Sequence, residues 1–244
     1  MGRTAQILLV SLGLLVAGPS YAGVNCPTSQ VAAQNYQAFW LWGGVKLPAQ
    51  VQNVDTLYLF QGEVVMRRGT GEWVRGGQPL ARLKVPKLWL TVRLETLTLS
   101  DTLLERLARL PERWQRAGNR VEGLQLDFDA ATYRLEEYGQ LLKKLRQRLD
   151  PRFQLGVTGL LDWAQTGSVT TLNQLPVDEI VIQTYQGRSS VQGYSSYLNA
   201  LSGLRRPFRI GLVQGGSWQT CWQQRLEQST FYRGAVVFVV PRKY

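Results

Sequence analysis

Short apolar runs of strand length recur along the chain. They lie at residues 39–42, 56–60, 88–92, 123–128, 153–158, 179–184, 208–213 and 235–240. From the fourth run onward they begin roughly every 25–30 residues, and the segments between them carry helical patterns. This alternation predicts β-strands that are joined by helices, as in repeated βα units.

Two of the intervening segments have clear helical patterns. Ser100 and Asp101 precede the first, whose leucines recur at helical spacing at positions 103, 104, 107 and 110. Thr132 opens the second, which places apolar residues on one face at positions 135, 138, 141, 142, 145 and 149. Asp150 and Pro151 end this helix, because the residue before a proline disfavours the helical conformation.

Eight strands with helices between them predict a single (β/α)8 barrel over residues 23–244, at the small end of the size range for that fold. The first third is less regular. Residues 62–87 contain glycines at 69 and 71 and at 76 and 77, which favour a hairpin insertion. An open, doubly wound sheet is the alternative, but no Gly-x-Gly-x-x-Gly turn follows a strand to make a dinucleotide site.

Residues 1–22 have the pattern of a secretory signal peptide. Arg3 gives a positive start, an apolar stretch follows, and Ser20-Tyr21-Ala22 places small residues where a signal peptidase cleaves. An uncleaved N-terminal anchor is the alternative. No lipobox precedes Cys26, and no later stretch is long and apolar enough to cross a bilayer. We therefore expect an exported protein, periplasmic or secreted, with no transmembrane segment after cleavage.

Export gives a meaning to the two cysteines. In an oxidising compartment Cys26 and Cys221, at opposite ends of the predicted domain, allow a single disulfide. Closing a loop of this length would restrict the unfolded chain by on the order of 4–5 kcal/mol. Two unpaired, partly buried thiols are the alternative.

Composition narrows the chemistry. The 244 residues include no histidine and only two cysteines, which excludes Ser-His-Asp and Cys-His nucleophiles, histidine bases and zinc sites of four thiolates or of paired Cys and His. Acid–base chemistry near neutral pH is left to carboxylates, tyrosine and lysine. We expect no metal and no cofactor.

The chain is strongly basic, with 28 Lys and Arg against 17 Asp and Glu and a net charge of +11. Removal of the leader, which holds one arginine and no acid, lowers this charge by one. A basic exported protein suits anionic partners such as acidic polysaccharides, envelope polymers or phospholipid surfaces. No concentrated Lys/Arg run and no nucleic-acid motif is present, so we do not expect a nucleic-acid partner.

The fourth apolar run is the most informative. Gln125, Asp127 and Asp129 share one parity and face the barrel interior, while the apolar residues between them face the helices. Active sites of such barrels lie at the carboxyl ends of the strands. When two acids point into one confined space, their pKa values move apart, so that one stays protonated while the other is ionised. This arrangement suits general acid catalysis. Glycoside hydrolysis is the commonest reaction that needs this arrangement.

This strand resembles the Asp-Gly-x-Asp-x-Asp-x-Glu strand of glycoside hydrolase family 18, the chitinase-like barrels. Gly123 matches the motif glycine, Asp127 the third carboxylate and Asp129 the catalytic acid. Tyr185 corresponds to the family's tyrosine at the end of strand six. The resemblance implies that Asp127 orients the substrate, that Asp129 donates the proton and that Tyr185 hydrogen-bonds to the substrate. A Tyr185 that only packs is the structural alternative.

The sequence departs from that motif at three positions. Glu122 replaces the first Asp, Gln125 the second, and Asp129 replaces the catalytic Glu with a side chain one methylene shorter. A displacement of about 1 Å can lower a rate roughly a hundredfold. The departures therefore favour a mechanism with two carboxylates over substrate-assisted hydrolysis.

Five segments resemble an exported bacterial family designated domain of unknown function 3142, a resemblance that implies no activity. They are FWLW at 39–42, LDFD at 126–129, GLLDW at 159–163, QTYQG at 183–187 and GLVQGG at 211–216. Together they span nearly the whole chain after the leader.

Further polar and aromatic residues fall near the ends of the predicted strands and are candidate substrate-binding residues. They are Trp40, Trp42, Arg93, Glu95, Asp162, Trp163, Gln183, Gln214 and Trp218. Aromatic faces stack on sugar rings, and Arg93 would pair with Asp127 and leave Asp129 as the better proton donor. The structural alternatives are tryptophans in the core, acids that are salt-bridged to Arg93, an interior ion pair of Arg93 with Glu95, and Asp162 as a helix N-cap.

We interpret the sequence as an exported glycoside-hydrolase-like barrel that acts on an envelope or extracellular polysaccharide. The alternative is a non-catalytic glycan-binding or envelope scaffolding protein on a degenerate hydrolase barrel. Asp129→Asn separates the two, because only in the enzyme should it abolish turnover while leaving the fold intact.

Overall fold

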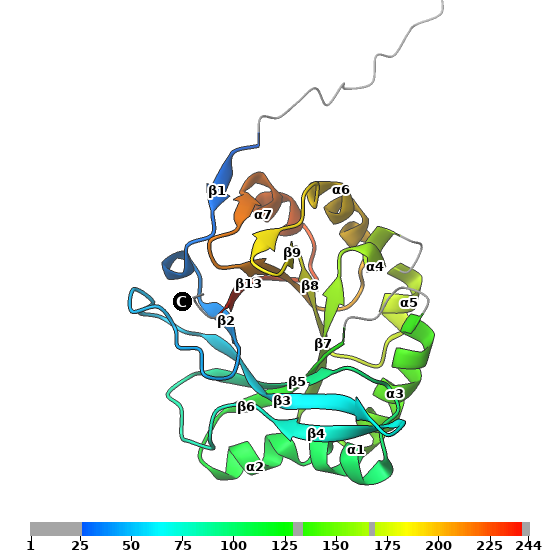
Figure 1. The fold of residues 1–244 in the computed structure, drawn as a ribbon. Coiled ribbons are helices and arrows are strands. Elements are labelled where there is room, and N and C mark those ends of the chain that lie inside the picture. The colour runs from blue at the N-terminus through cyan, green and yellow to red at the C-terminus, as the bar shows by residue number, and fades with distance from the viewer. Residues whose placement is uncertain (1–25, 129–133, 166–168, 241–244) are drawn as a thin grey trace, which may run out of the picture.

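The computed structural model describes residues 26–128, 134–165 and 169–240, and its main strands close into a barrel (Figure 1). Eight parallel strands form the ring: β2 (Ala38–Leu41), β3 (Thr56–Arg67), β5 (Lys87–Leu94), β6 (Val121–Asp127), β7 (Gln154–Leu160), β8 (Glu179–Gln183), β11 (Phe208–Val213) and β13 (Tyr232–Val239). They pair in this order, and β13 pairs with β2 to close the ring. The predicted (β/α)8 architecture is confirmed, and each predicted apolar run contributes one strand.

Helices cover the outside of the ring (Figure 1). They are α1 (Asp101–Ala108), α2 (Leu110–Arg116), α3 (Leu135–Arg148), α4 (Asp162–Gln165), α5 (Val169–Gln174), α6 (Ser195–Leu198), α7 (Cys221–Leu226) and the 3-10 helices Ala33–Asn35 and Asn199–Gly203. The side chain of Ser100 caps α1 as predicted, accepting a hydrogen bond from the Leu103 amide at 3.3 Å. Pro111 is the second residue of α2, and proline fits this first helical turn because no amide donor is needed there. Thr132, the predicted start of α3, lies outside the described residues.

The first third of the barrel is irregular, as expected. Residues 42–55 and 76–86 connect strands without a helix. β4 (Thr70–Arg75) pairs antiparallel with the second half of β3, and this hairpin lies outside the ring. Arg68 and Gly69 take positive φ values of 49° and 83° at its turn. The predicted hairpin insertion is therefore confirmed.

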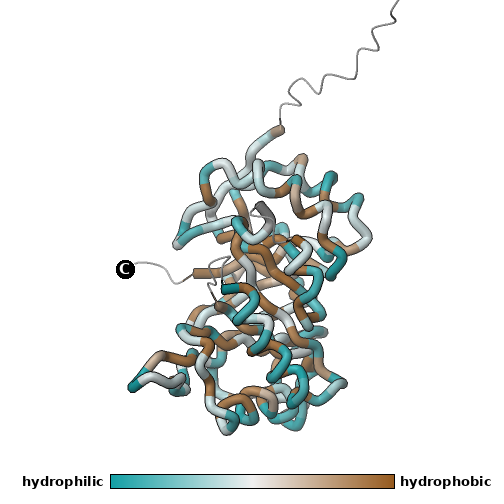
Figure 2. Tube along the Cα trace, turned by 90° about the vertical axis from the view of Figure 1, so that its right-hand side faces the viewer, coloured by the Kyte–Doolittle hydropathy of each residue, from teal (hydrophilic) through white to brown (hydrophobic). Residues whose placement is uncertain are grey.

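Apolar side chains fill two layers, one between the strands and the helices and one inside the ring. The strands form the hydrophobic centre of the molecule, and hydrophilic residues lie mainly around it (Figure 2). Inside the ring, Trp89 packs across two glycines: a Cβ at Gly123 or at Gly156 would lie 2.9 Å from its ring. The motif glycine at 123 is thus explained by packing. No helix among the described residues is long and apolar enough to cross a membrane.

An ion pair occupies the base of the barrel interior, at the amino ends of the strands. Arg209 Nε lies 2.9 Å from the Glu179 carboxylate, and the Tyr58 hydroxyl donates a hydrogen bond to the same carboxylate. Burial, followed by the charge of Glu179, raises the pKa of Tyr58 well above its usual value. Since all three side chains are partnered with one another, we assign them a structural role at this end of the barrel.

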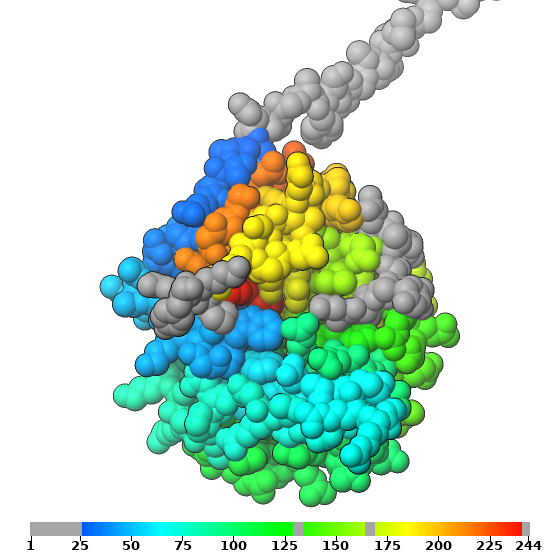
Figure 3. Space-filling model, viewed as in Figure 1, coloured from blue at the N-terminus to red at the C-terminus, as the bar shows by residue number. Residues whose placement is uncertain are grey.

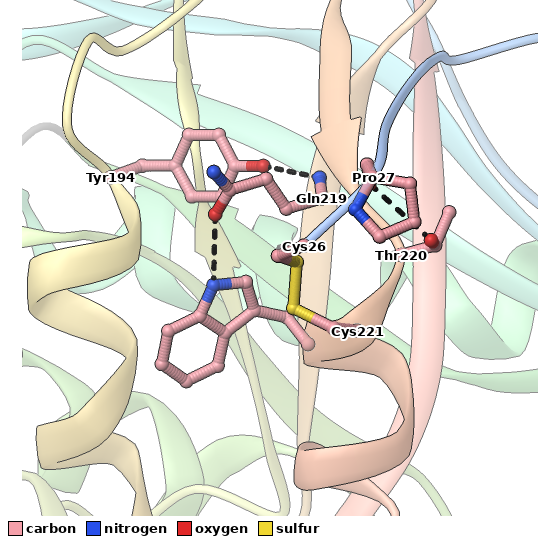
Figure 4. The surroundings of a disulfide bond; sticks show 7 residues. Cys26, Pro27, Tyr194, Gln219, Thr220 and Cys221 are labelled. Carbon is pink, nitrogen blue, oxygen red and sulfur yellow. Dashed lines mark hydrogen bonds between the residues drawn. A yellow bond between two sulfur atoms is a disulfide. The ribbon is translucent and has the colours of Figure 1, made fainter. Parts of the chain in front are cut away.

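A disulfide fastens the N-terminal end to the outside of the barrel. Cys26 and Cys221 are bonded, with 5.5 Å between their Cα atoms, so the predicted pairing is confirmed. Next to it, β1 (Thr28–Gln30) pairs antiparallel with β12 (Ser217–Gln219). Hydrogen bonds of Gln219 and Thr220 surround the bridge (Figure 4). A small ladder of β9 (Tyr185–Gln186) and β10 (Ser189–Ser190) lies between β8 and α6.

Candidate functional site

A hollow of about 630 Å3 opens at the carboxyl ends of the barrel strands. We call it the mouth hollow. The side chains that line it come from the ends of most strands in the ring and from the loops that follow them: Trp42, Phe60, Glu63, Arg93, Asp127, Gln183, Tyr185, Arg188 and Val240. In the space-filling view, the segments that follow β2 and β8 lie on either side of the red end of β13 (Figure 3). Residues distant in sequence therefore meet at one place.

Asp127 is the buried acid of this hollow. It is the last residue of β6 and is 6% exposed. Its Oδ1 accepts hydrogen bonds from Thr158 Oγ1 at 2.5 Å and from Gln183 Nε2 at 3.4 Å. The register places Arg93 of β5 beside it. Donors from two other strands thus hold the carboxylate in one orientation at the open end of the barrel.

Aromatic rings form one wall of the mouth hollow. Trp42 is half-buried, and the Arg93 guanidinium lies over its ring, 5.7 Å from the centroid. The Tyr185 ring packs against Phe238 at 5.0 Å. A partly exposed aromatic wall beside a fixed carboxylate is an arrangement that suits a sugar ring, whose C–H face is apolar and whose edge is polar.

The barrel is packed solid beneath this wall. Trp40 is fully buried, stacks on Phe238 at 5.2 Å, and donates a hydrogen bond from Nε1 to Gln125 Oε1 at 2.9 Å. The hollow is therefore a shallow mouth and does not continue as a channel. Two cationic side chains, Arg93 and Arg188, and two acidic ones, Glu63 and Asp127, contribute charges of both signs to its lining.

Five of the predicted site residues line the mouth hollow together: Trp42, Arg93, Asp127, Gln183 and Tyr185. Asp129, the predicted proton donor, lies outside the described residues. Gln125 faces the interior, as its parity predicted, but it serves the packed layer below.

The other candidates do not line the hollow. Trp40 belongs to the barrel core, while Trp163 and Trp218, 0% and 3% exposed, belong to the layer outside the ring. These three rings offer no open face to a sugar. Glu95 is exposed and accepts a hydrogen bond from the Met66 amide at 3.4 Å, away from the hollow.

Asp162 and Gln214 are also absent from the lining. Asp162 is the first residue of the short helix α4. Gln214 follows β11, and its backbone N–H donates a hydrogen bond to the Phe238 carbonyl at 3.0 Å. The parity of a strand end indicates which way a side chain points, but it does not show whether the next loop covers it.

Among the described residues, five side chains that line or support the hollow were not predicted from the sequence. Thr158 has inward parity at the end of a predicted strand, so the same pattern that selected Asp127 was available for it. Phe60 and Val240 are the last residues of two predicted strands, whereas Glu63 falls where β3 continues into the hairpin, beyond the predicted strand. Arg188 lies in the turn between β9 and β10, for which the sequence carries no signal. Among the described residues, no group of three or more acidic or cysteine side chains gathers where it could hold a metal ion.

Comparison with known proteins gives one family and several similar folds. Residues 82–208 match the family described as Domain of unknown function (DUF3142). No curated protein matches the chain.

Three solved structures are similar to the chain. The chitinase domain of the spore coat protein CotE from Clostridium difficile is 14% identical with a TM-score of 0.45, over 85% of this chain and 74% of its own. The spore cortex-lytic enzyme SleL of Bacillus cereus is 19% identical with a TM-score of 0.41, over 66% of this chain and 43% of its own. The ICChI chitinase from Ipomoea carnea is 14% identical with a TM-score of 0.38, over 63% of this chain and 68% of its own. This chain thus spans less than half the length of the SleL chain.

Proposed function

Because the chain belongs to the family described as domain of unknown function DUF3142, whose description gives no activity, we propose its function from the barrel mouth itself. The protein is a glycoside-hydrolase-like barrel that acts on an envelope or extracellular polysaccharide. The observation that carries this proposal is the fixed, buried carboxylate of Asp127 beside the aromatic wall of an open hollow.

The roles follow from position and from the resemblance of the β6 sequence to the chitinase-like motif. Asp127 orients the substrate or stabilises developing positive charge at the anomeric carbon, since it faces the hollow with Thr158 and Gln183 behind it. Asp129, two residues further and of the same parity, is the proton donor by its sequence position. Tyr185 donates a hydrogen bond to the sugar, and Trp42 stacks on its apolar face.

Export is part of the proposal. Residues 1–22 carry the signal-peptide pattern, and the Cys26–Cys221 disulfide supports an oxidising compartment, where such bonds form and persist. An envelope or extracellular glycan is the substrate class that this location provides.

The test measures the release of reducing ends by the full chain. Its substrates are chitin oligosaccharides, peptidoglycan glycan strands and polygalacturonate. Asp129→Asn should abolish release, and Asp127→Asn should lower the rate at least about a hundredfold, the typical scale of a lost acid–base group. Asp101→Asn is the matched control, because this aspartate lies on the surface of α1 and pairs with Arg148 at 2.6 Å. Release by Asp129→Asn at the wild-type rate would contradict the assignment.

A non-catalytic glycan-binding protein is the second candidate, and two contacts favour it. Gln125 and Glu122, which stand where the chitinase-like motif has acids, are engaged elsewhere: Gln125 binds Trp40, and Glu122 accepts from Gln154 Nε2 at 2.7 Å. Half of the motif therefore serves the fold. Glycan binding that Trp42→Ala weakens, without reducing-end release by the wild type, would favour this candidate.

A further inference from the structure

A second hollow, of about 280 Å3, lies outside the barrel between the β3–β4 hairpin and helices α1 and α2. We call it the arginine groove. Among the described residues, no acidic side chain lines it, and five arginines do: Arg75, Arg106, Arg109, Arg113 and Arg116. The mouth hollow, in contrast, is lined by charges of both signs.

The sequence explains why these arginines converge. Positions 106, 109, 113 and 116 are spaced by three, four and three residues, which places them on one face of consecutive helical turns. α1 and α2 follow each other with only Arg109 between them, so the face continues across both helices. Arg75, the last residue of β4, lines the same groove from the hairpin.

Two of the arginines already have a carboxylate partner on their own helical segment. Arg109 lies 4.0 Å from Glu105, and Arg116 lies 3.7 Å from Glu112, both as exposed pairs one helical turn apart. Such pairs contribute little energy and are readily exchanged for another anion.

The remaining three arginines give the groove its excess charge. Arg106 lies over the Trp73 ring, 5.4 Å from the centroid, which restricts its guanidinium. Arg75 and Arg113 are exposed, and within the described part of the chain neither has a carboxylate within 4.0 Å. Guanidinium groups that have no carboxylate partner among the described residues can donate to a bound carboxylate or phosphate.

The floor of the groove is satisfied internally. Gln61 is buried, its Oε1 accepts from Trp114 Nε1 at 2.9 Å, and its Nε2 donates to the Phe60 carbonyl at 3.1 Å. The ligand therefore meets the arginines and not the floor. Trp114 is buried and Arg106 covers Trp73, so no broad aromatic face is open to stack a nucleic-acid base.

The arginine groove adjoins the mouth hollow. Phe60 and Gly76 line the mouth, while their chain neighbours Gln61 and Arg75 line the groove. Both hollows therefore border the same hairpin. A polymer that leaves the mouth across this hairpin would bring its next charged groups to the arginines.

We propose that the arginine groove binds the carboxylate or phosphate groups of an acidic polysaccharide that extends from the barrel mouth. The polysaccharide nature of the ligand rests on the proposed function, whereas the anion specificity rests on the groove alone. The groove would thus select charged glycans over neutral ones before any bond is cleaved.

The test measures binding to the full chain by titration calorimetry at low and moderate salt. The glycan probes are polygalacturonate, phosphomannan and neutral pullulan, and an oligothymidine and phosphatidylglycerol vesicles serve as the other anionic probes. The two acidic polymers separate a carboxylate ligand from a phosphate ligand. Arg75→Gln with Arg113→Gln should weaken binding of the preferred acidic polymer roughly tenfold. The matched control is Lys84→Gln with Lys143→Gln, which removes the same charge from exposed positions outside the groove and should change binding less than about twofold. Binding should also weaken as salt rises.

Three results would overturn the proposal: no binding of either acidic polymer, equal losses in the two double variants, or binding only to an oligothymidine or to phosphatidylglycerol vesicles. The Asp127→Asn variant distinguishes failure of the groove proposal from failure of the proposed function. If that variant and the wild type behave alike on every glycan while the double arginine variant still loses acidic polymer, the barrel proposal fails and the groove stands. If the hydrolase assay succeeds and the double variant binds normally, only the groove fails.

Discussion

Removing the Cys26–Cys221 disulfide should lower the free energy of unfolding substantially while the barrel stays folded. The bond joins residues 195 positions apart, so nearly the whole described chain lies within one closed loop. In the chain-entropy treatment, a loop of this length restricts the unfolded state by about 5 kcal/mol at 25 °C. Residual structure in the unfolded chain reduces this value, so we expect the Cys26→Ser, Cys221→Ser variant to lose about 2–5 kcal/mol in its free energy of unfolding.

The structure also indicates where the loss would be felt first. β1 pairs with β12 at three positions, outside the ring of eight strands. The strands of the ring pair with one another and do not depend on the bridge. Amide hydrogen exchange should therefore accelerate at residues 26–31 and 217–222 and stay slow in β6.

Urea unfolding followed by far-ultraviolet circular dichroism measures this effect on the oxidised protein, on the reduced protein and on the double serine variant. The reduced protein and the variant should have the same lowered midpoint and an unchanged native spectrum. A loss below about 1 kcal/mol, or a variant without native secondary structure, would refute the reasoning from loop closure.

Three other predictions concern single side chains. Thr158→Val removes the hydroxyl that donates to Asp127 and should lower the free energy of unfolding by about 1–3 kcal/mol. Urea titration measures this change, and an unchanged free energy of unfolding would show that the hydrogen bond does not contribute to stability. Burial raises the pKa of Tyr232 above its ordinary value, so the folded state holds this proton more tightly than the unfolded chain does. Stability is then full below about pH 10 and falls as the pH rises further, by up to about 1.4 kcal/mol per unit for this group; Tyr232→Phe should reduce that slope, and an equal slope would contradict the assignment. Gly77→Ala should destabilise the folded protein by about 1–3 kcal/mol, because its Cβ would lie 2.1 Å from the Phe60 carbonyl oxygen. Gly139→Ala in α3 should instead stabilise it by up to about 1 kcal/mol. A higher thermal unfolding midpoint for Gly77→Ala than for Gly139→Ala would contradict this prediction.

The fold could be predicted because strands that are buried on both faces read as continuous apolar runs. All eight runs became ring strands, and the regular spacing from β6 onward indicated the barrel. The leucine pattern at 103–110 predicts one helix, whereas the structure has a break between α1 and α2 next to Pro111, a residue that favours the first turn of a new helix. The closure of β13 on β2 involves residues about 200 positions apart, and only the strand count pointed to it.

The candidate site could be predicted in part. Parity placed Asp127 and Gln183 inside the ring, because side chains alternate across a strand. Parity does not give depth along the barrel axis, so Trp40 and Trp42 look alike in the sequence while one is in the core and the other lines the mouth. Trp163 packs outside the ring, where a Cβ at Gly159 would lie 2.8 Å from its ring, a fit that only tertiary structure reveals.

The central claim is that the barrel mouth around Asp127 receives a glycan. A crystal structure of the Asp129→Asn variant with the oligosaccharide that the wild type cleaves or binds best tests it most directly. The account predicts a sugar in the mouth hollow, with a polar group within hydrogen-bond distance of the Asp127 carboxylate and a ring against Trp42 or Tyr185. An oligosaccharide bound elsewhere, with the mouth hollow free of sugar, would contradict it.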